Sequence, residues 1–280
     1  MRPAFELAGF AGLSASLLLL AGCSGNAPAK LAAPTTTTTT AAEPAHAAPA
    51  ARPALKRPAA FDTIKAESDK GVIIGRVIYQ GTPPKPKAIN FGADKVCGDL
   101  HKGQSAFYEN LVVNPDSTIK WALVSIRGKV PGKFTPPAKP VEIDQQGCVF
   151  TPHVLAMMAG QEIEYKNSDP LSHNIRTNAR RNPPFNKIFA SKMTSKSTLD
   201  LAEQAIQVKC DIHFWMSAFL HVLPHPFFAV TGDDGVFVIP GVPPGNYTLS
   251  AWHETIKIPD QKVTLGAGEV KEIDFVVSND

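Results

Sequence analysis

Short apolar runs bounded by glycine, proline, asparagine and aspartate recur along the chain from about residue 71 onward. This pattern is typical of an all-β sandwich or barrel. It predicts strands at 72–79, 108–113, 121–127 and 198–201, and a further series after residue 228. At most one turn of helix is expected between residues 61 and 70, and no longer helical periodicity follows.

Candidate metal ligands lie in residues 206–216, where a strand-like alternation ends. Ile206, Val208 and Cys210 alternate with polar residues, which places the Cys210 thiol on the apolar face of a strand. The alternation then stops, and His213 and Met216 follow at three-residue intervals. A tight loop with this spacing can direct a thiolate, an imidazole and a thioether toward one point, a soft donor set that suits copper.

Such a site needs a second histidine, and the stretch 162–174 offers one. Ile163 and Tyr165 alternate with charged residues, which indicates a half-buried strand. Asn-Ser-Asp-Pro at 167–170 then favours a turn, and His173 follows it.

With His173-Asn174 and the C-x-x-H-x-x-M run in view, the chain resembles the cupredoxins, the family of plastocyanin, pseudoazurin and amicyanin. The resemblance implies a Greek-key β-sandwich over 141–227 with one type 1 copper site. Its equatorial ligands would be His173, Cys210 and His213, and its axial ligand Met216. It also implies that Asn174 ties the two ligand loops together.

Other interpretations stay open. The Cys210, His213 and Met216 run is compatible with an inert or degenerate site that binds no copper, because buried free cysteines are common. Zinc suits the set less well, since Met is a poor zinc ligand. We interpret His153, His221 and His225 as structural or solvent-facing.

The N-terminus predicts export. Arg2 precedes an apolar run, and Leu20-Ala21-Gly22-Cys23 ends it, so 1–22 is read as a signal peptide. The ending resembles the lipobox of bacterial lipoproteins, which implies lipidation of Cys23 and an extracytoplasmic protein anchored to a bacterial membrane, in the periplasm or at the outer membrane. Residues 23–70 are rich in Ala, Pro and Thr and predict a disordered tether.

An oxidising compartment also bears on the remaining cysteines. Cys97 and Cys148 are expected to form a disulfide, which leaves Cys210 for metal. Alternative pairings that include Cys210 would abolish the copper site.

The run Val230–Leu249 contains Asp-Asp-Gly and Pro-Pro-Gly turns and resembles the carboxypeptidase regulatory-like, transthyretin-type β-sandwich. Residues 71–84 resemble its opening strand. We therefore expect a sandwich begun by 71–140, interrupted by the cupredoxin-like segment 141–227 and completed by 228–280, with tight hairpins at 233–235 and 266–268. Two domains in tandem is the simpler alternative.

The functional prediction is electron transfer between redox protein partners outside the cytoplasm, with Phe214 and Trp215 as a candidate docking patch or as a cover over the metal. A copper carrier or storage protein is one rival. A non-redox module that binds glycan or an envelope protein through Trp252, His253 and Glu254 is another. The net charge of +3 without a basic run argues against nucleic acid. The chain has no paired-carboxylate motif, G-x-S-x-G or P-loop, so we do not expect an enzyme.

Overall fold

The computed structural model describes residues 67–92 and 94–278. Within these ranges the chain is built from β-strands and one α-helix, α1 (Lys95–Leu100), so the predicted all-β class is confirmed. The predicted signal segment 1–22, the predicted lipidation site Cys23 and nearly all of the predicted tether 23–70 lie outside the described residues. No helix in the described part is long and apolar enough to cross a membrane.

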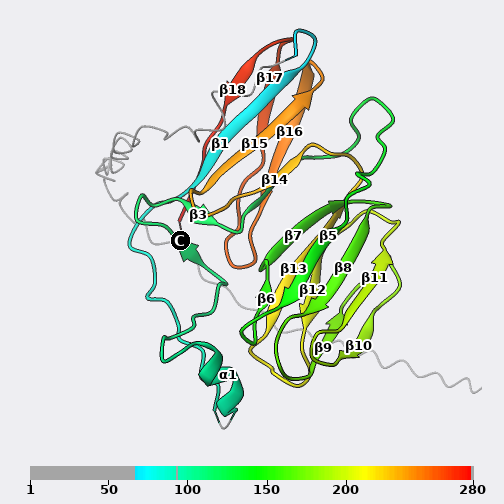
Figure 1. Ribbon diagram of the computed structural model, residues 1–280. Coiled ribbons are helices and arrows are strands. Elements are labelled where there is room, and N and C mark those ends of the chain that lie inside the picture. Colours follow the sequence, from blue (N-terminus) through cyan, green and yellow to red (C-terminus); the bar gives the residue numbers. More distant parts are fainter. Residues whose placement is uncertain (1–66, 93, 279–280) are drawn as a thin grey trace, which may run out of the picture. The chain divides into compact units, whose positions relative to one another are not determined.

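One sandwich is formed by residues 141–223, and we call it the 141–223 sandwich (Figure 1). Its five-stranded sheet has the order β10-β9-β12-β13-β7 and its four-stranded sheet the order β11-β8-β5-β6. The strands are β5 (Val141–Gln145), β6 (Phe150–Thr151), β7 (Val154–Met158), β8 (Glu162–Asn167), β9 (His173–Thr177), β10 (Asn186–Phe189), β11 (Thr194–Thr198), β12 (Glu203–Lys209) and β13 (Ser217–Leu223). Side chains of both sheets, among them Ile163, Tyr165, Val208 and Leu220, share one buried core.

Strands from both sides of that segment form a second sandwich, the split sandwich. One sheet has the order β15-β1-β18 with β19 also on β1, and the other has the order β14-β4-β16-β17. These strands are β1 (Gly71–Tyr79), β4 (Leu123–Ile126), β14 (Phe228–Val230), β15 (Val236–Val242), β16 (Gly245–Trp252), β17 (Gln261–Leu265), β18 (Val270–Glu272) and β19 (Phe275–Val277). Ile73 and Val124 from the early strands pack with Phe237 and Leu249 from the late ones. Strands on both sides of the 141–223 segment therefore share one core.

The turns of the C-terminal part differ from the prediction in what they connect. Gly235 has φ +61°, as the Asp-Asp-Gly turn requires, but β14 before it and β15 after it belong to different sheets. Gly266-Ala267-Gly268 likewise separates β17 in one sheet from β18 in the other. The predicted tight hairpins are therefore wrong. Each turn carries the chain across the core, so that both apolar faces are covered.

Three other elements depart from the expectation. The strand predicted at 108–113 is reduced to β2 (Val112–Val113), which pairs with β3 (Ile119–Lys120). The strand predicted at 198–201 lies earlier, as β11, which ends at Thr198. Helix α1 was not predicted, because six residues are too few to show helical periodicity. The helix matters because it contains Cys97 of the disulfide and begins next to the candidate site.

Candidate metal centre

Sheet geometry brings the two ligand loops to one place. Strands β9 and β12 are antiparallel neighbours, with Lys209 paired to Arg176. The start of β9, where His173 lies, and the end of β12, just before Cys210, therefore lie at the same end of the sheet. The loop 210–216 then connects β12 to β13, whose first residue Ser217 pairs with Lys209.

His173 is held by the turn that precedes it. Asn167 donates a side-chain hydrogen bond to the carbonyl of Leu171 at 2.8 Å and accepts one from the backbone N–H of Asp169 at 3.0 Å. This arrangement places Oδ2 of Asp169 2.8 Å from Nε2 of His173. Because a carboxylate only accepts, Nε2 carries the proton, and Nδ1 is the nitrogen that faces the site.

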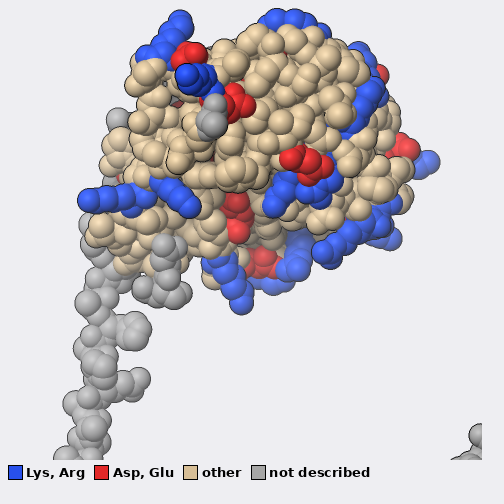
Figure 2. Space-filling model, turned by 90° about the horizontal axis from the view of Figure 1, so that it is seen from below, with Lys and Arg blue, Asp and Glu red and all other residues tan. Residues whose placement is uncertain are grey.

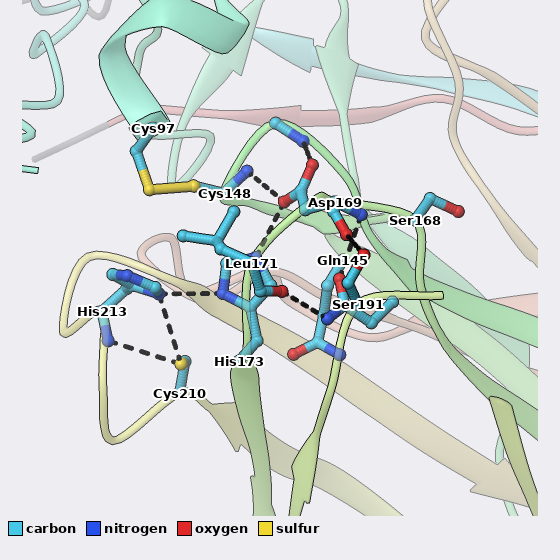
Figure 3. Close-up of polar contacts among 12 residues, drawn as sticks. Cys97, Gln145, Cys148, Ser168, Asp169, Leu171, His173, Ser191, Cys210 and His213 are labelled. Carbon is cyan, nitrogen blue, oxygen red and sulfur yellow. Dashed lines mark hydrogen bonds and ion pairs between the residues drawn. A yellow bond between two sulfur atoms is a disulfide. The ribbon is translucent and has the colours of Figure 1, made fainter. Parts of the chain in front are cut away.

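Cys210 and His213 approach His173 from the 210–216 loop (Figure 3). The Nδ1 atoms of the two histidines are 2.8 Å apart, and Sγ of Cys210 is 3.9 Å from Nδ1 of His213. All three ligand atoms lie within 4.8 Å of one another, and all three residues are buried. The loop is closed by a hydrogen bond from the Met216 N–H to the His213 carbonyl at 2.9 Å.

Met216 and Asn174, the two other predicted site residues, lie beside this cluster. Met216 is buried in the same core as Cys210. Asn174 donates its backbone N–H to Sγ of Cys210 at 3.3 Å, and its side-chain oxygen accepts from the Asp211 N–H at 3.1 Å. Asn174 therefore connects the start of β9 to the loop that contains Cys210 and His213.

The electrostatics of the site favour a thiolate. Burial alone would raise the pKa of the Cys210 thiol, but hydrogen bonds from His173 and from backbone N–H groups, including that of Asn174, outweigh it and lower the pKa. Burial also opposes the charged form of His173, yet its hydrogen bonds with Asp169 and Cys210 raise its pKa. Burial and the charge of His173 lower the pKa of His213.

The donor set fits copper. One sulfur and two imidazole nitrogens converge at a buried point, and each imidazole is oriented by a carboxylate behind it, as metal-ligating histidines usually are. Two imidazoles, a thiolate and a nearby thioether form the ligand set of type 1 copper. Zinc would more often have a fourth Cys, His or carboxylate ligand.

Two carboxylates of the site were missed by the sequence analysis. Asp169 lies four residues before His173, inside the turn that was identified, and its spacing to the histidine was a usable signal. Asp94 accepts from Nε2 of His213 at 3.0 Å, across 119 positions of sequence. Its one local signal is its position as the N-cap of α1.

Phe214 and Trp215 have different environments. Phe214 is 81% exposed, whereas Trp215 is buried and donates Nε1–H to the Cys148 carbonyl at 3.0 Å. The rings of Trp215 and His213 are 5.1 Å apart, so the indole covers the imidazole. The exposed part of the predicted docking patch is therefore Phe214, next to the partly exposed Ile212. Figure 2 shows one face of the molecule, over which Lys and Arg are spread, several of them beside an acidic side chain.

The remaining histidines lie elsewhere. His153 contacts the Ser217 carbonyl at 3.0 Å through Nδ1, and its Nε2 pairs with Glu254. His221 is fully buried and lies edge-on to Trp252, with ring centroids 4.4 Å apart. His225 donates Nε2–H to the Ile126 carbonyl at 3.0 Å.

The residues suggested for glycan binding have internal contacts. Trp252 packs against His221 and Phe219, His253 is buried, and Glu254 pairs with His153. Glycan binding through these residues stays a prediction.

No protein-family model and no curated protein matches the chain. Solved structures similar to it include a Cu-containing nitrite reductase from Thermus scotoductus, at 21% identity and a TM-score of 0.29, over 34% of this chain and 25% of that one. A purple cupredoxin from Nitrosopumilus maritimus shows 16% identity and a TM-score of 0.26, over 30% of this chain and 99% of that one. A Cu(I) amicyanin variant shows 14% identity and a TM-score of 0.28, over 36% of this chain and 98% of that one.

The chain thus spans a quarter of the nitrite reductase but nearly all of the two smaller proteins. These similar structures are cupredoxins or copper proteins by name. Because every TM-score is below 0.5, the case for a metal site rests on the geometry described above.

Proposed function

We propose that this protein is an envelope-tethered type 1 (blue) copper protein that transfers single electrons between partners outside the cytoplasm. The observation that carries the proposal is the convergence of Nδ1 of His173, Nδ1 of His213 and Sγ of Cys210 at one buried point. Copper bound there would supply a one-electron couple between Cu(I) and Cu(II).

The chain's own residues suit this role because hydrogen bonds within the protein hold each ligand side chain in place. Cys210 receives N–H hydrogen bonds from Asn174 and His213, at 3.3 and 3.4 Å, which stabilise its thiolate. Asp169 and Asp94 fix the orientations of the two imidazoles. Burial excludes water from the ligand atoms. Ligands fixed in this way would move little between oxidation states, which favours fast electron transfer.

The test is the visible and EPR spectrum of the full chain after one equivalent of Cu(II), compared with Cys210→Ser. An intense thiolate-to-copper band that Cys210→Ser abolishes is the expected result. Met216→Leu, which conserves volume, should keep the band and shift the reduction potential, because a long axial ligand tunes it. No band in the unsubstituted protein would refute a type 1 site.

Release of the metal distinguishes a copper carrier with the same ligands from an electron-transfer protein. An electron-transfer protein should retain Cu(I) against a competing chelator and cycle reversibly with a redox reagent. Rapid loss of Cu(I) to the chelator, with slow redox cycling, would instead favour delivery or storage.

The proposed location rests on the N-terminal sequence. Cys23 would carry the lipid anchor, and the Ala/Pro/Thr-rich stretch that follows would give the copper domain reach. Cys23→Ala should shift the protein from the membrane fraction to the soluble extracytoplasmic fraction. Unchanged membrane association would contradict a lipid anchor at Cys23.

A further inference from the structure

A carboxylate from outside the 141–223 sandwich holds His213. Asp94, the N-cap of α1, accepts from the Cys97 N–H through Oδ1 at 3.1 Å. Its Oδ2 lies 3.0 Å from Nε2 of His213. Both partners are N–H donors, so both oxygens of Asp94 act as acceptors.

Asp169 holds His173 in the same way. Its Oδ2 accepts from the Cys148 N–H at 2.8 Å and lies 2.8 Å from Nε2 of His173, while Oδ1 accepts from the Gly147 N–H at 2.6 Å (Figure 3). Burial would raise the pKa of Asp169, but the bonds from His173 and the two backbone N–H groups lower it. Asp169 is therefore a buried carboxylate in a fixed position.

The disulfide joins these two arrangements. Cys97 donates to Asp94, Cys148 donates to Asp169, and the two cysteines are bonded to each other across 51 positions of sequence. Each half of the disulfide thus supports the carboxylate that orients one histidine of the site. We call these four residues, Asp94, Cys97, Cys148 and Asp169, the clamp.

The segment around α1 also has non-covalent contacts with the 141–223 sandwich. Phe91 stacks on His101 with ring centroids 5.0 Å apart and contacts the edge of Trp215 at 5.5 Å. Nε2 of His101 lies 2.8 Å from the Gly147 carbonyl. These contacts hold the segment near the site, and Asp94 is the residue of the segment that meets a ring nitrogen of His213 among those that the structure describes.

We propose that the clamp positions both histidines, and that Asp94, held by the disulfide, is the positioning residue for His213. The clamp sets the direction of each Nδ1 through the hydrogen bond at Nε2 on the opposite side of the ring. This inference rests on the proposed copper site and extends it to a segment that precedes the 141–223 sandwich.

Asp94→Asn is the sharpest variant, because it keeps the shape and removes one acceptor. An amide has one oxygen for two N–H donors, so its NH₂ group must face either Cys97 or His213. Asp99→Asn is the matched control: it makes the same change at an exposed position of the same helix. Asp169→Asn tests the other half of the clamp.

Two measurements on the full chain are needed. The first is Cu(II) affinity by competition with a chelator, together with the copper EPR spectrum. Loss of an outer hydrogen bond to a ligating histidine typically lowers metal affinity about 10- to 100-fold, and we expect that range for Asp94→Asn and no change for Asp99→Asn. The EPR parameters of Asp94→Asn should change as well.

The second measurement needs no metal. Long-range ¹H–¹⁵N NMR of the imidazoles should show His213 protonated at Nε2 in the metal-free protein and in Asp99→Asn, and altered in Asp94→Asn. A merely structural role for Asp94 would lower unfolding stability without changing the His213 tautomer or the EPR parameters.

The disulfide is tested with Cys97→Ser/Cys148→Ser. The disulfide would act on His213 through Asp94. The loss of Cu(II) affinity in the variant that combines Asp94→Asn with the two cysteine substitutions should therefore be smaller than the sum of the separate losses. Wild-type affinity, spectrum and tautomer in Asp94→Asn would overturn the inference. A wild-type protein without a thiolate band would refute the proposed function instead, and the NMR measurement would still decide the clamp.

Discussion

The Nδ1 atoms of His173 and His213 face each other at 2.8 Å, and both side chains are buried at one end of the five-stranded sheet. Both Nε2 atoms face carboxylates, so the two Nδ1 atoms are the ring nitrogens left to bind a metal. A soft metal ion would bind the same two atoms together with Sγ of Cys210. The fold therefore directs these three ligand atoms at one point.

Metal should consequently stabilise the folded state. A ligand that binds only the folded protein adds about 2.7 kcal/mol to the free energy of unfolding at 100 times its Kd. We expect a copper-dependent stabilisation of this order in urea unfolding of the full chain. His213→Asn should abolish it, while His225→Asn, which changes a histidine of another core, should retain it. Equal stabilisation in both variants would place the metal elsewhere.

The two aromatic residues next to the site are expected to have different roles, with Phe214 in docking and Trp215 in the structure of the site. Phe214 is 81% exposed, whereas Trp215 is buried and bonded to the Cys148 carbonyl. Phe214→Ser should slow electron transfer to a protein partner and leave the copper spectrum and stability unchanged. Ile188→Ser, at a residue 65% exposed on β10, is the control for loss of surface apolar area. If both variants react at the unsubstituted rate, Phe214 is not at the docking surface.

Much of the site could be predicted because its signals are local. The alternation ending at Cys210, the three-residue spacing to His213 and Met216, and the turn before His173 are all visible in short windows of sequence. Asp94 could not be found in this way, because its contact to His213 depends on the folded path of a chain segment with no periodicity.

The fold shows the same limit. Apolar alternation identified individual strands and their core-facing side chains, such as Ile163 and Tyr165 of β8. It did not identify the sheet that each strand joins, so the turn at Gly235 was expected to close a hairpin that does not form. A turn motif fixes local backbone angles, whereas sheet membership depends on which apolar faces remain to be covered.

Two buried histidines predict acid sensitivity. Burial lowers the pKa of His221 to about 3, and that of His253 to about 4. In the unfolded chain both titrate near 6.5, so the unfolded state takes up protons first as the pH falls. Their contribution to stability is complete above about pH 6.5 and is lost progressively toward pH 3 to 4.

For His221 alone the expected loss between pH 7 and pH 5 is about 2 kcal/mol. Urea unfolding of the metal-free protein at the two pH values measures it. His221→Gln should reduce the pH dependence by that amount, because the amide does not titrate. In the unsubstituted protein the Ala205 N–H donates to Nδ1 of His221 at 3.2 Å, and the Gln side-chain oxygen can accept the same hydrogen bond. An identical fall in stability for His221→Gln and the unsubstituted protein would contradict this assignment.

The split sandwich contains a buried ion pair between its two sequence segments. Arg76 on β1 and Asp274 before β19 lie 2.9 Å apart, with side chains 6% and 3% exposed, and the Arg76 N–H also donates to Asp274. Removing one partner leaves an uncompensated buried charge, which typically costs about 3–5 kcal/mol. Arg76→Met should therefore lower the free energy of unfolding by several kcal/mol. Lys196→Met, which breaks an exposed pair with Glu162, should cost less than about 1 kcal/mol.

The distribution of that loss tests whether strands on both sides of the 141–223 segment unfold together. Since Arg76 and Asp274 are 198 positions apart, hydrogen exchange in Arg76→Met should rise in β1 and in β15 to β19 alike. The amides of β8 and β12, in the other core, should be affected less. Faster exchange confined to β1 would mean that the C-terminal strands hold their structure without it, and that the early and late strands are not one cooperative unit.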